Sequence, residues 1–203
     1  MNKGLLIEQD SFNIIKREMI KNFTNLELPI VQRVIHATGD FDFEQIIRFH
    51  PDAIKNGCEA IKNGLDIFVD VKMVEAGINK ILLNKFGGKI LCHISDEDVI
   101  IRAEKEKLTR AEASVDKAVE KSGNRIGVVA IGNAPTALLR VMELIDKGSF
   151  NPALVIGVPV GFVSALESKD LLNSKKYPFI TCLGRKGGSP IAVSIVNALM
   201  KLI

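Results

Sequence analysis

Tryptophan is absent from this chain of 203 residues, and tyrosine and cysteine are rare, with one and three copies. The few aromatic rings disfavour a protein that stacks nucleic-acid bases on aromatic side chains. The cysteines, Cys58, Cys92 and Cys182, are far apart and form no CxxC pair. The sequence therefore indicates neither a zinc site nor a disulfide framework, and we expect Cys92 and Cys182 to lie in the core.

A strong charge of one sign and long apolar runs are also missing. The net charge of +3 is too small to indicate a nucleic-acid partner. Neither a signal-peptide pattern nor an apolar run of membrane-spanning length is present, so we expect a cytoplasmic protein without a membrane partner. Because 47% of the residues are apolar, we predict a packed globular protein in which residues 1–203 form a single domain.

Short apolar or β-branched runs alternate with helix-like segments from Leu65 onwards. This alternation is typical of a parallel sheet with helices on both faces. We predict a three-layer α/β fold with a mostly parallel sheet of five strands, at residues 65–69, 89–94, 126–131, 153–156 and 179–183. The predicted helices cover residues 71–83, 96–105, 109–121, 135–147, 164–172 and 190–203.

The first sixty or so residues are predicted to form a helical segment that packs against the sheet. Apolar residues at helical spacing predict a helix over residues 9–22, capped by Asp10 or Ser11. An apolar stretch over residues 30–35 ends at His36. Two short helices are predicted over residues 42–49 and 52–63, because Pro51 separates them.

Three of the predicted strands are followed by loops rich in glycine, proline and small polar residues, at residues 132–136, 157–161 and 184–189. In open parallel sheets, ligands bind outside the carboxyl ends of the strands. The loops therefore indicate a site whose backbone N–H groups and nearby cations suit a large anionic ligand. None of them fits G-x-G-x-x-G or the Walker pattern, so a dinucleotide or P-loop nucleotide site is poorly supported.

The three histidines differ in their surroundings. His93 ends a predicted strand, where core and functional roles are about equally favoured. His50 lies between two predicted helices and is expected to be structural or exposed. His36 ends an apolar run and is followed by small residues, so its ring can face a cleft. Because histidine moves protons near neutral pH, a catalytic role for His36 is as well supported as a structural one.

Several stretches of the chain together resemble the precorrin-8X methylmutase family, including its cobalt-precorrin-8 form. The resemblance runs nearly end to end, and its longest and most specific parts are residues 131–137 and 159–169. The matching stretches are Arg33-Val34-Ile35-His36, Asp70-Val71-Lys72-Met73-Val74, Thr109-Arg110-Ala111, Ile131-Gly132-Asn133-Ala134-Pro135-Thr136-Ala137, Pro159-Val160-Gly161-Phe162-Val163, Glu167-Ser168-Lys169 and Lys186-Gly187-Gly188-Ser189.

The resemblance implies an isomerase of cobalamin biosynthesis that moves a methyl group from ring carbon 11 to ring carbon 12 of a tetrapyrrole. It implies His36 as the catalytic proton donor, with Ser11 and Arg33 as substrate contacts. No cofactor and no protein metal site are expected, because any cobalt would belong to the substrate. The resemblance also implies a homodimer with sites near the interface.

Such a substrate carries many carboxylates around a flat apolar ring, which cations and close backbone N–H groups would recognise. Arg185 is expected near the rim of this ring. The other residues expected to bind the substrate are Arg110, Asn133, Pro135, Thr136, Gly157, Pro159, Gly161, Lys169, Lys186, Gly187 and Gly188.

Two alternatives remain open at this stage: a tetrapyrrole carrier without catalytic activity, and an α/β enzyme whose glycine loops hold a phosphorylated substrate. The sequence also leaves open whether the tetrapyrrole contains cobalt. A composition rich in Lys, Ile and Asn is typical of an AT-rich genome, often that of an anaerobe, and this slightly favours the cobalt form of the anaerobic route.

Overall fold

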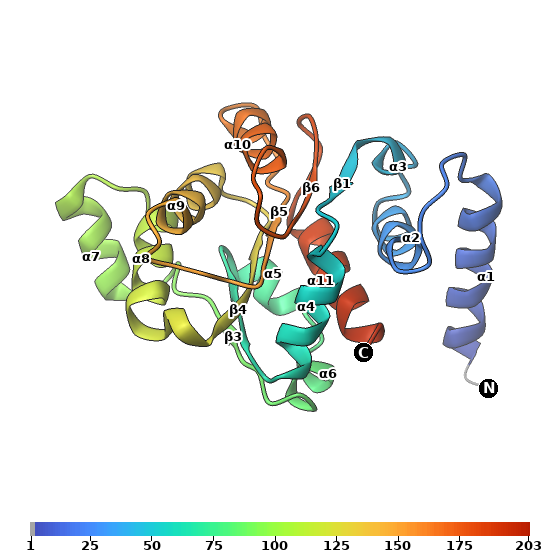
Figure 1. Cartoon of the computed structure of the whole chain (residues 1–203), viewed down its shortest axis with the longest axis horizontal. Helices are drawn as coiled ribbons and strands as arrows, with labels where there is room; N and C mark the ends of the chain where they lie inside the picture. Colours follow the sequence, from blue (N-terminus) through green and yellow to red (C-terminus); the bar gives the residue numbers. More distant parts are fainter. Residues whose placement is uncertain (1–2) are drawn as a thin grey trace.

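The computed structural model describes residues 3–203 as one six-stranded sheet flanked by helices (Figure 1). The strand order is β1-β6-β5-β4-β2-β3. Five strands are parallel, and β1 pairs antiparallel with β6 at one edge. The strands are β1 (Ile47–Phe49), β2 (Asp66–Val69), β3 (Ile90–Leu91), β4 (Ile126–Ile131), β5 (Leu154–Gly157) and β6 (Phe179–Cys182).

Helices cover both faces of the sheet. One face packs against α2 (Glu27–Thr38), α4 (Ala53–Lys62), α5 (Lys72–Gly77) and α11 (Ser189–Lys201). The other face packs against α8 (Arg110–Ser122), α9 (Pro135–Asp146) and α10 (Ala165–Asn173). Helix α1 (Lys3–Glu18) packs on α2, and α7 (Glu97–Glu106) packs on α8, at opposite ends of the molecule (Figure 1). The short elements are α3 (Phe43–Ile46), α6 (Lys80–Asn84) and a 3₁₀ turn at Gly123–Arg125.

The strands are buried on both faces, which explains their nearly continuous apolar sequences. In β2, Ile67 and Val69 contribute to the core beneath α2, α4 and α11, whereas Phe68 contributes to the core beneath α8, α9 and α10. The predicted three-layer fold with a mostly parallel sheet is therefore confirmed.

The predicted number of strands was one too few. We predicted a helix over residues 42–49, but only one helical turn forms, in α3, and the chain continues as β1. Ile47 pairs with Cys182 and Phe49 pairs with Ile180. A single turn is a poor helix nucleus, whereas the open edge of β6 offers hydrogen bonds that local sequence patterns do not reveal.

Two predicted helix boundaries were also wrong. Asp10 and Ser11 do not cap α1 but lie inside it, where the Ser11 hydroxyl donates a hydrogen bond to the Ile7 carbonyl at 2.8 Å. The single helix predicted over residues 71–83 is divided into α5 and α6. The Asn79 side chain accepts a hydrogen bond from the Leu82 N–H at 3.0 Å and so caps the start of α6.

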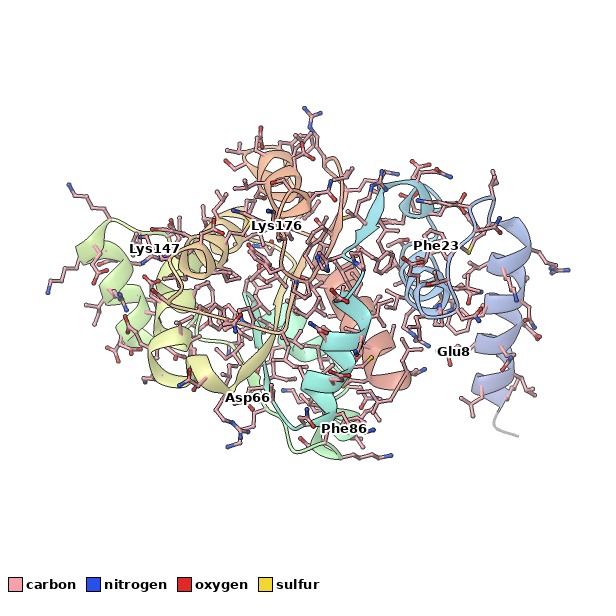
Figure 2. All side chains as sticks on the ribbon, in the orientation of Figure 1. Glu8, Phe23, Asp66, Phe86, Lys147 and Lys176 are labelled. Atoms are coloured by element: carbon pink, nitrogen blue, oxygen red, sulfur yellow. The ribbon has the colours of Figure 1, made fainter. Side chains whose placement is uncertain are left out.

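The N-terminal helices form the end of the molecule beyond β1 (Figure 1). Helix α2 packs directly on α11, which lies on the sheet. Figure 2 shows Glu8 between α1 and α2, where its carboxylate lies 3.1 Å from the Arg33 guanidinium. Within residues 3–203, every helix is too short or too polar to cross a lipid bilayer.

Candidate functional site

The three glycine-rich loops meet at the carboxyl edge of the parallel strands. The Gly188 N–H donates to the Val158 carbonyl at 2.8 Å, and the Gly161 N–H donates to the Arg185 carbonyl at 3.3 Å. Gly187 lies so close to the second loop that a Cβ atom would be 2.3 Å from the Val158 oxygen. The second and third loops therefore form one platform that only glycine at residue 187 permits.

The first loop is held by Asp70, which follows β2 and is 1% exposed. Its carboxylate accepts hydrogen bonds from the N–H groups of Gly132, Asn133 and Ala134 at 3.0, 2.8 and 2.7 Å. Burial raises the pKa of Asp70, and these N–H donors partly oppose that shift. Asp70 was not among the predicted site residues, although a carboxylate directly after a buried strand is a usable signal.

Arg110, Asn133 and Thr136 lie at the α8 end of this edge. The Thr109 and Thr136 hydroxyls are 3.0 Å apart, and Thr109 also caps α8 through a reciprocal pair of bonds with Glu112. The cap thereby anchors the first loop to α8 and places Arg110 one residue from the contact. Arg110 and Asn133 are exposed, so this end presents an arginine and an amide to solvent.

His36, Ser11 and Arg33 form the other end. His36 lies in the last turn of α2, and its ring packs against the Phe12 ring with centroids 5.3 Å apart. The Arg33 guanidinium lies 5.1 Å from the centroid of the same ring. Phe12, which was not among the predicted site residues, therefore joins α1 to the His36 end of α2, in addition to the ion pair between Glu8 and Arg33.

A pocket of about 230 Å³ opens beside the imidazole and is lined by Ser11, Ile14, Ile15, Ile35, His36, Gly39 and Phe41. Arg33 and Phe12 line a neighbouring pocket of about 260 Å³. His36 is exposed and makes no hydrogen bond or ion pair with any of residues 3–203. Both ring nitrogens are thus available to a ligand.

Lys186 connects the third loop to this end of the site. Its ammonium lies 2.6 Å from a carboxylate oxygen of Asp40 and 2.6 Å from one of Asp42. The hydrogen bond from Lys186 lowers the pKa of Asp40. We expected Lys186 to be an available cation, but in this structure two carboxylates neutralise it.

Lys169 was expected on the rim of the substrate and instead lies inside the protein. Its side chain is fully buried, because α10 packs against β6 and directs it inwards. The ammonium donates to the Lys186 carbonyl at 2.7 Å, and the Cys182 thiol donates to the same oxygen at 3.2 Å. Among residues 3–203 no carboxylate forms an ion pair with Lys169, and burial lowers its pKa. Lys169 therefore supports the third loop from beneath.

Other predicted residues on the loops have structural roles in this conformation. Gly157 ends β5, where a Cβ atom would lie 2.5 Å from Leu172. Pro159 is buried and Pro135 begins α9, whereas Gly161 is partly exposed. Gly157 and Pro159 therefore shape the platform without presenting a surface to a ligand.

The two remaining histidines, unlike His36, each have a polar partner. The His93 ring lies 2.7 Å from the Asp96 carboxylate, which also accepts from the Lys117 ammonium at 2.6 Å. His50 accepts a hydrogen bond from the Asp52 N–H at 3.2 Å. The contact of His50 agrees with its expected structural role, whereas for His93 the two predicted roles, core and functional, both stay predictions.

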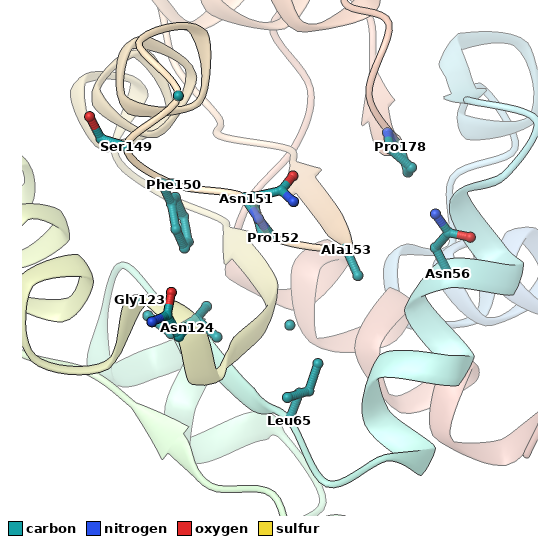
Figure 3. Close-up of a pocket in the computed structure, with 13 residues that line it drawn as sticks. Asn56, Leu65, Gly123, Asn124, Ser149, Phe150, Asn151, Pro152, Ala153 and Pro178 are labelled. Carbon is teal, nitrogen blue, oxygen red and sulfur yellow. The ribbon is translucent and has the colours of Figure 1, made fainter.

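A larger cavity, of about 550 Å³, lies at the amino edge of the sheet and contains none of the predicted site residues (Figure 3). Asn56 on α4 lies across it from Asn151 and Pro152. Its lining includes no charged side chain. It therefore lacks the cations that a ligand with many carboxylates requires.

Comparison with known proteins identifies the family to which this chain belongs. Residues 6–202 match the family model of precorrin-8X methylmutase. The chain belongs to the precorrin-8X methylmutase family. It is 48% identical to the cobalt-precorrin-8 methylmutase of Priestia megaterium, over 95% of this chain and 85% of that protein. It is 46% identical to the cobalt-precorrin-8 methylmutase of Leptospira interrogans, over 99% of this chain and 94% of that protein.

A solved structure supports the same relationship. The crystal structure of precorrin-8x methyl mutase from Thermus thermophilus matches with a TM-score of 0.88 and 42% identity, over 97% of this chain and 96% of that one. The family resemblance inferred from the sequence is confirmed. As a member of the precorrin-8X methylmutase family, the protein is an isomerase of cobalamin biosynthesis.

Proposed function

We propose that this isomerase moves a methyl group from ring carbon 11 to ring carbon 12 of cobalt-precorrin-8, giving cobyrinate, with His36 as the proton donor. The observation that carries the proposal is the exposed imidazole of His36, which makes no hydrogen bond or ion pair with any of residues 3–203 and lines a pocket with Ser11. The family match supplies the reaction class.

The reaction balances without any other reactant. The bond from the methyl group to one ring carbon breaks, the bond to its neighbour forms, and the conjugated ring redistributes its electrons. A proton that His36 donates to the conjugated macrocycle draws electron density towards the protonated atom, and it returns to His36 when the product forms. In the cobalt form the ring nitrogens hold the metal, so the proton goes to a carbon of the conjugated ring. Such general acid catalysis contributes about 10²–10⁴-fold to the rate. We therefore propose that the reaction needs no cofactor.

The substrate would lie along the carboxyl edge of the sheet. Its apolar ring and carboxylate arms require close backbone approach together with cations. The second and third loops offer such a platform, and Arg33, Arg185 and Arg110 lie along this edge and its two ends. Lys186 would join them if a substrate carboxylate displaced Asp40 or Asp42.

We favour the cobalt form of the substrate and a homodimer. The two relatives with the highest identities given above are named for cobalt-precorrin-8. One chain holds His36 beyond β1 and Arg110 on the opposite side of the sheet, so a second copy could bring the two ends together across an interface. Three free cysteines agree with a reducing, cytoplasmic setting.

Incubation with cobalt-precorrin-8 and with metal-free precorrin-8 tests the reaction. We expect the spectrum of the rearranged ring with wild-type protein, at the higher rate for the cobalt form. His36→Ala should fold and bind tetrapyrrole but lose turnover. Binding of both forms without turnover by the wild type would instead indicate a carrier, and full activity of His36→Ala would disprove the assigned proton donor.

Mixing two inactive variants tests the shared site. If each site takes His36 from one chain and Arg110 from the other, a dimer of His36→Ala with Arg110→Ala retains one intact site. Random exchange of subunits should then restore about a quarter of the wild-type activity. No recovery after demonstrated exchange would show that both residues serve the site of their own chain, and full activity of Arg110→Ala alone would show that Arg110 has no role.

A further inference from the structure

Two apolar side chains directly after the second loop lie in solvent beside the platform. Phe162 is 83% exposed and Val163 is 82% exposed. An exposed phenyl ring leaves a large apolar area in water, and burying it on a ligand is correspondingly favourable. This pair, which we call the apolar tip, belongs to none of the apolar core clusters within residues 3–203.

The backbone holds the apolar tip outwards through unusual conformations on both sides. Gly161, before it, has φ 152°, and Ser164, after it, has φ 59°. Ser164 is one of only two non-glycine residues with positive φ within residues 3–203. Strained positions of this kind are retained where the surrounding structure enforces them, and they cluster at ligand clamps and active sites.

The base of the tip is joined to the predicted substrate platform. The Gly161 N–H donates to the Arg185 carbonyl, and the Gly188 N–H donates to the Val158 carbonyl. The tip therefore stands on the second and third loops, at the carboxyl edge where ligands bind in open parallel sheets.

A cation accompanies the tip. The Arg185 guanidinium lies 5.3 Å from the centroid of the Phe162 ring. Within residues 3–203, Arg185 forms no ion pair with a carboxylate, in contrast to its neighbour Lys186. An exposed apolar ring beside an uncompensated guanidinium matches a flat apolar ligand with carboxylate arms.

We propose that Phe162 and Val163 cover one face of the bound macrocycle and that Arg185 binds one of its carboxylate arms. This inference rests on the proposed function and adds to it the residues that recognise the ring face. A second copy of the chain is a less suitable occupant, because two side chains supply little of the roughly 800 Å² that each partner buries in a stable interface. A partner would also have to neutralise Arg185.

The lack of tryptophan makes the test direct. Phe162→Trp introduces the only tryptophan of the chain at the proposed contact. Titration with cobyrinate, the proposed product, should quench its fluorescence with the dissociation constant that absorbance gives for the wild type. Ile81→Trp is the matched control, since Ile81 is 79% exposed on α6, at the opposite side of the view from α10 (Figure 1). Its fluorescence should respond much less.

Truncation provides the second measurement. Phe162→Ala and Arg185→Ala should each weaken cobyrinate binding about tenfold, with unchanged sedimentation behaviour and unfolding midpoint. Unquenched Phe162→Trp fluorescence despite binding seen by absorbance would overturn the inference and leave the proposed function intact. A changed oligomeric state of Phe162→Ala would also overturn it, in favour of a second copy as occupant. Absence of both binding and turnover in the wild type would refute the proposed function and this inference with it.

Discussion

Removal of the Asp70 carboxylate should release the first loop from the sheet. In Asp70→Ala, three N–H groups lose their acceptor. The N–H of Gly132 is buried and would stay unsatisfied, at a cost of about 1–3 kcal/mol. Those of Asn133 and Ala134 are nearer to solvent, so each should cost about 0.5–1.5 kcal/mol. The free energy of unfolding should therefore fall by about 2–4 kcal/mol, because relief of the burial penalty on the carboxylate offsets part of the lost hydrogen bonding.

Asp70→Asn should cost less than Asp70→Ala, because one amide oxygen can keep the two bonds that share a single carboxylate oxygen. Urea unfolding measures both variants, and hydrogen exchange at residues 132–134 tests whether the loss is local. Asp170→Ala is a suitable control, since Asp170 is exposed on α10 and makes no ion pair within residues 3–203. A change below about 0.5 kcal/mol in Asp70→Ala, the range of ordinary surface substitutions, would refute the reasoning.

The pH dependence supplies an independent check on Asp70. Because burial raises its pKa in the folded state, its contribution to stability is complete below the unfolded pKa and is lost as the pH rises through the folded pKa. The stability of the wild type relative to Asp70→Asn should therefore increase as the pH is lowered from neutral towards the ordinary carboxyl pKa. The opposite trend would mean that the three N–H hydrogen bonds lower the pKa of Asp70 by more than burial raises it.

Further outcomes are expected at three residues. Lys169→Met should raise the free energy of unfolding at pH 7 by about 1–3 kcal/mol, because it removes a buried cation that has no carboxylate partner. Turnover should nevertheless fall, because the third loop loses the hydrogen bond from Lys169 to the Lys186 carbonyl. A variant less stable than the wild type in urea unfolding would contradict the first prediction. Burial raises the pKa of Cys182 to about 11, so its contribution to stability is complete below pH 9 and is lost towards pH 11, and the stability advantage over Cys182→Ala should shrink across that range. Native protein should also leave this thiol unreactive towards alkylating reagents at pH 8, and rapid labelling would disprove its burial. Arg33→Ala should weaken product binding about tenfold with less than about 1 kcal/mol of lost stability, because its ion pair with Glu8 is partly exposed; an unchanged dissociation constant would exclude a substrate contact.

Local patterns predicted the elements that are long or periodic. The helices over residues 96–105 and 109–121 match α7 and α8 closely, because their apolar residues recur at helical spacing and Thr109 caps the second. The buried strands were also predicted from local sequence, because strands covered on both faces are apolar throughout. Strand β1 was missed because its three residues are fixed by pairing with β6, which is remote in sequence.

The site shows the same division between local and remote information. Glycines and prolines after the strands predicted the three loops, because the residue types that favour a turn lie within the turn itself. Side-chain direction was not predictable in the same way. Lys169 and Lys186 were both predicted to be rim cations, but the packing of α10 buries Lys169, and Asp40 and Asp42 in the turn after α2 neutralise Lys186.

The sequence by itself determined the fold class, the family and the positions of the three loops, because these follow from periodicity, turn residues and long specific motifs. Only the tertiary structure decided that Asp70 holds the first loop, that Phe12 joins His36 to Arg33, and that Phe162 stands in solvent beside Arg185. Each of these depends on which side chains meet across elements far apart in sequence. A contact of that kind has no local signature, because its free energy arises from the burial and hydrogen bonding of both partners together.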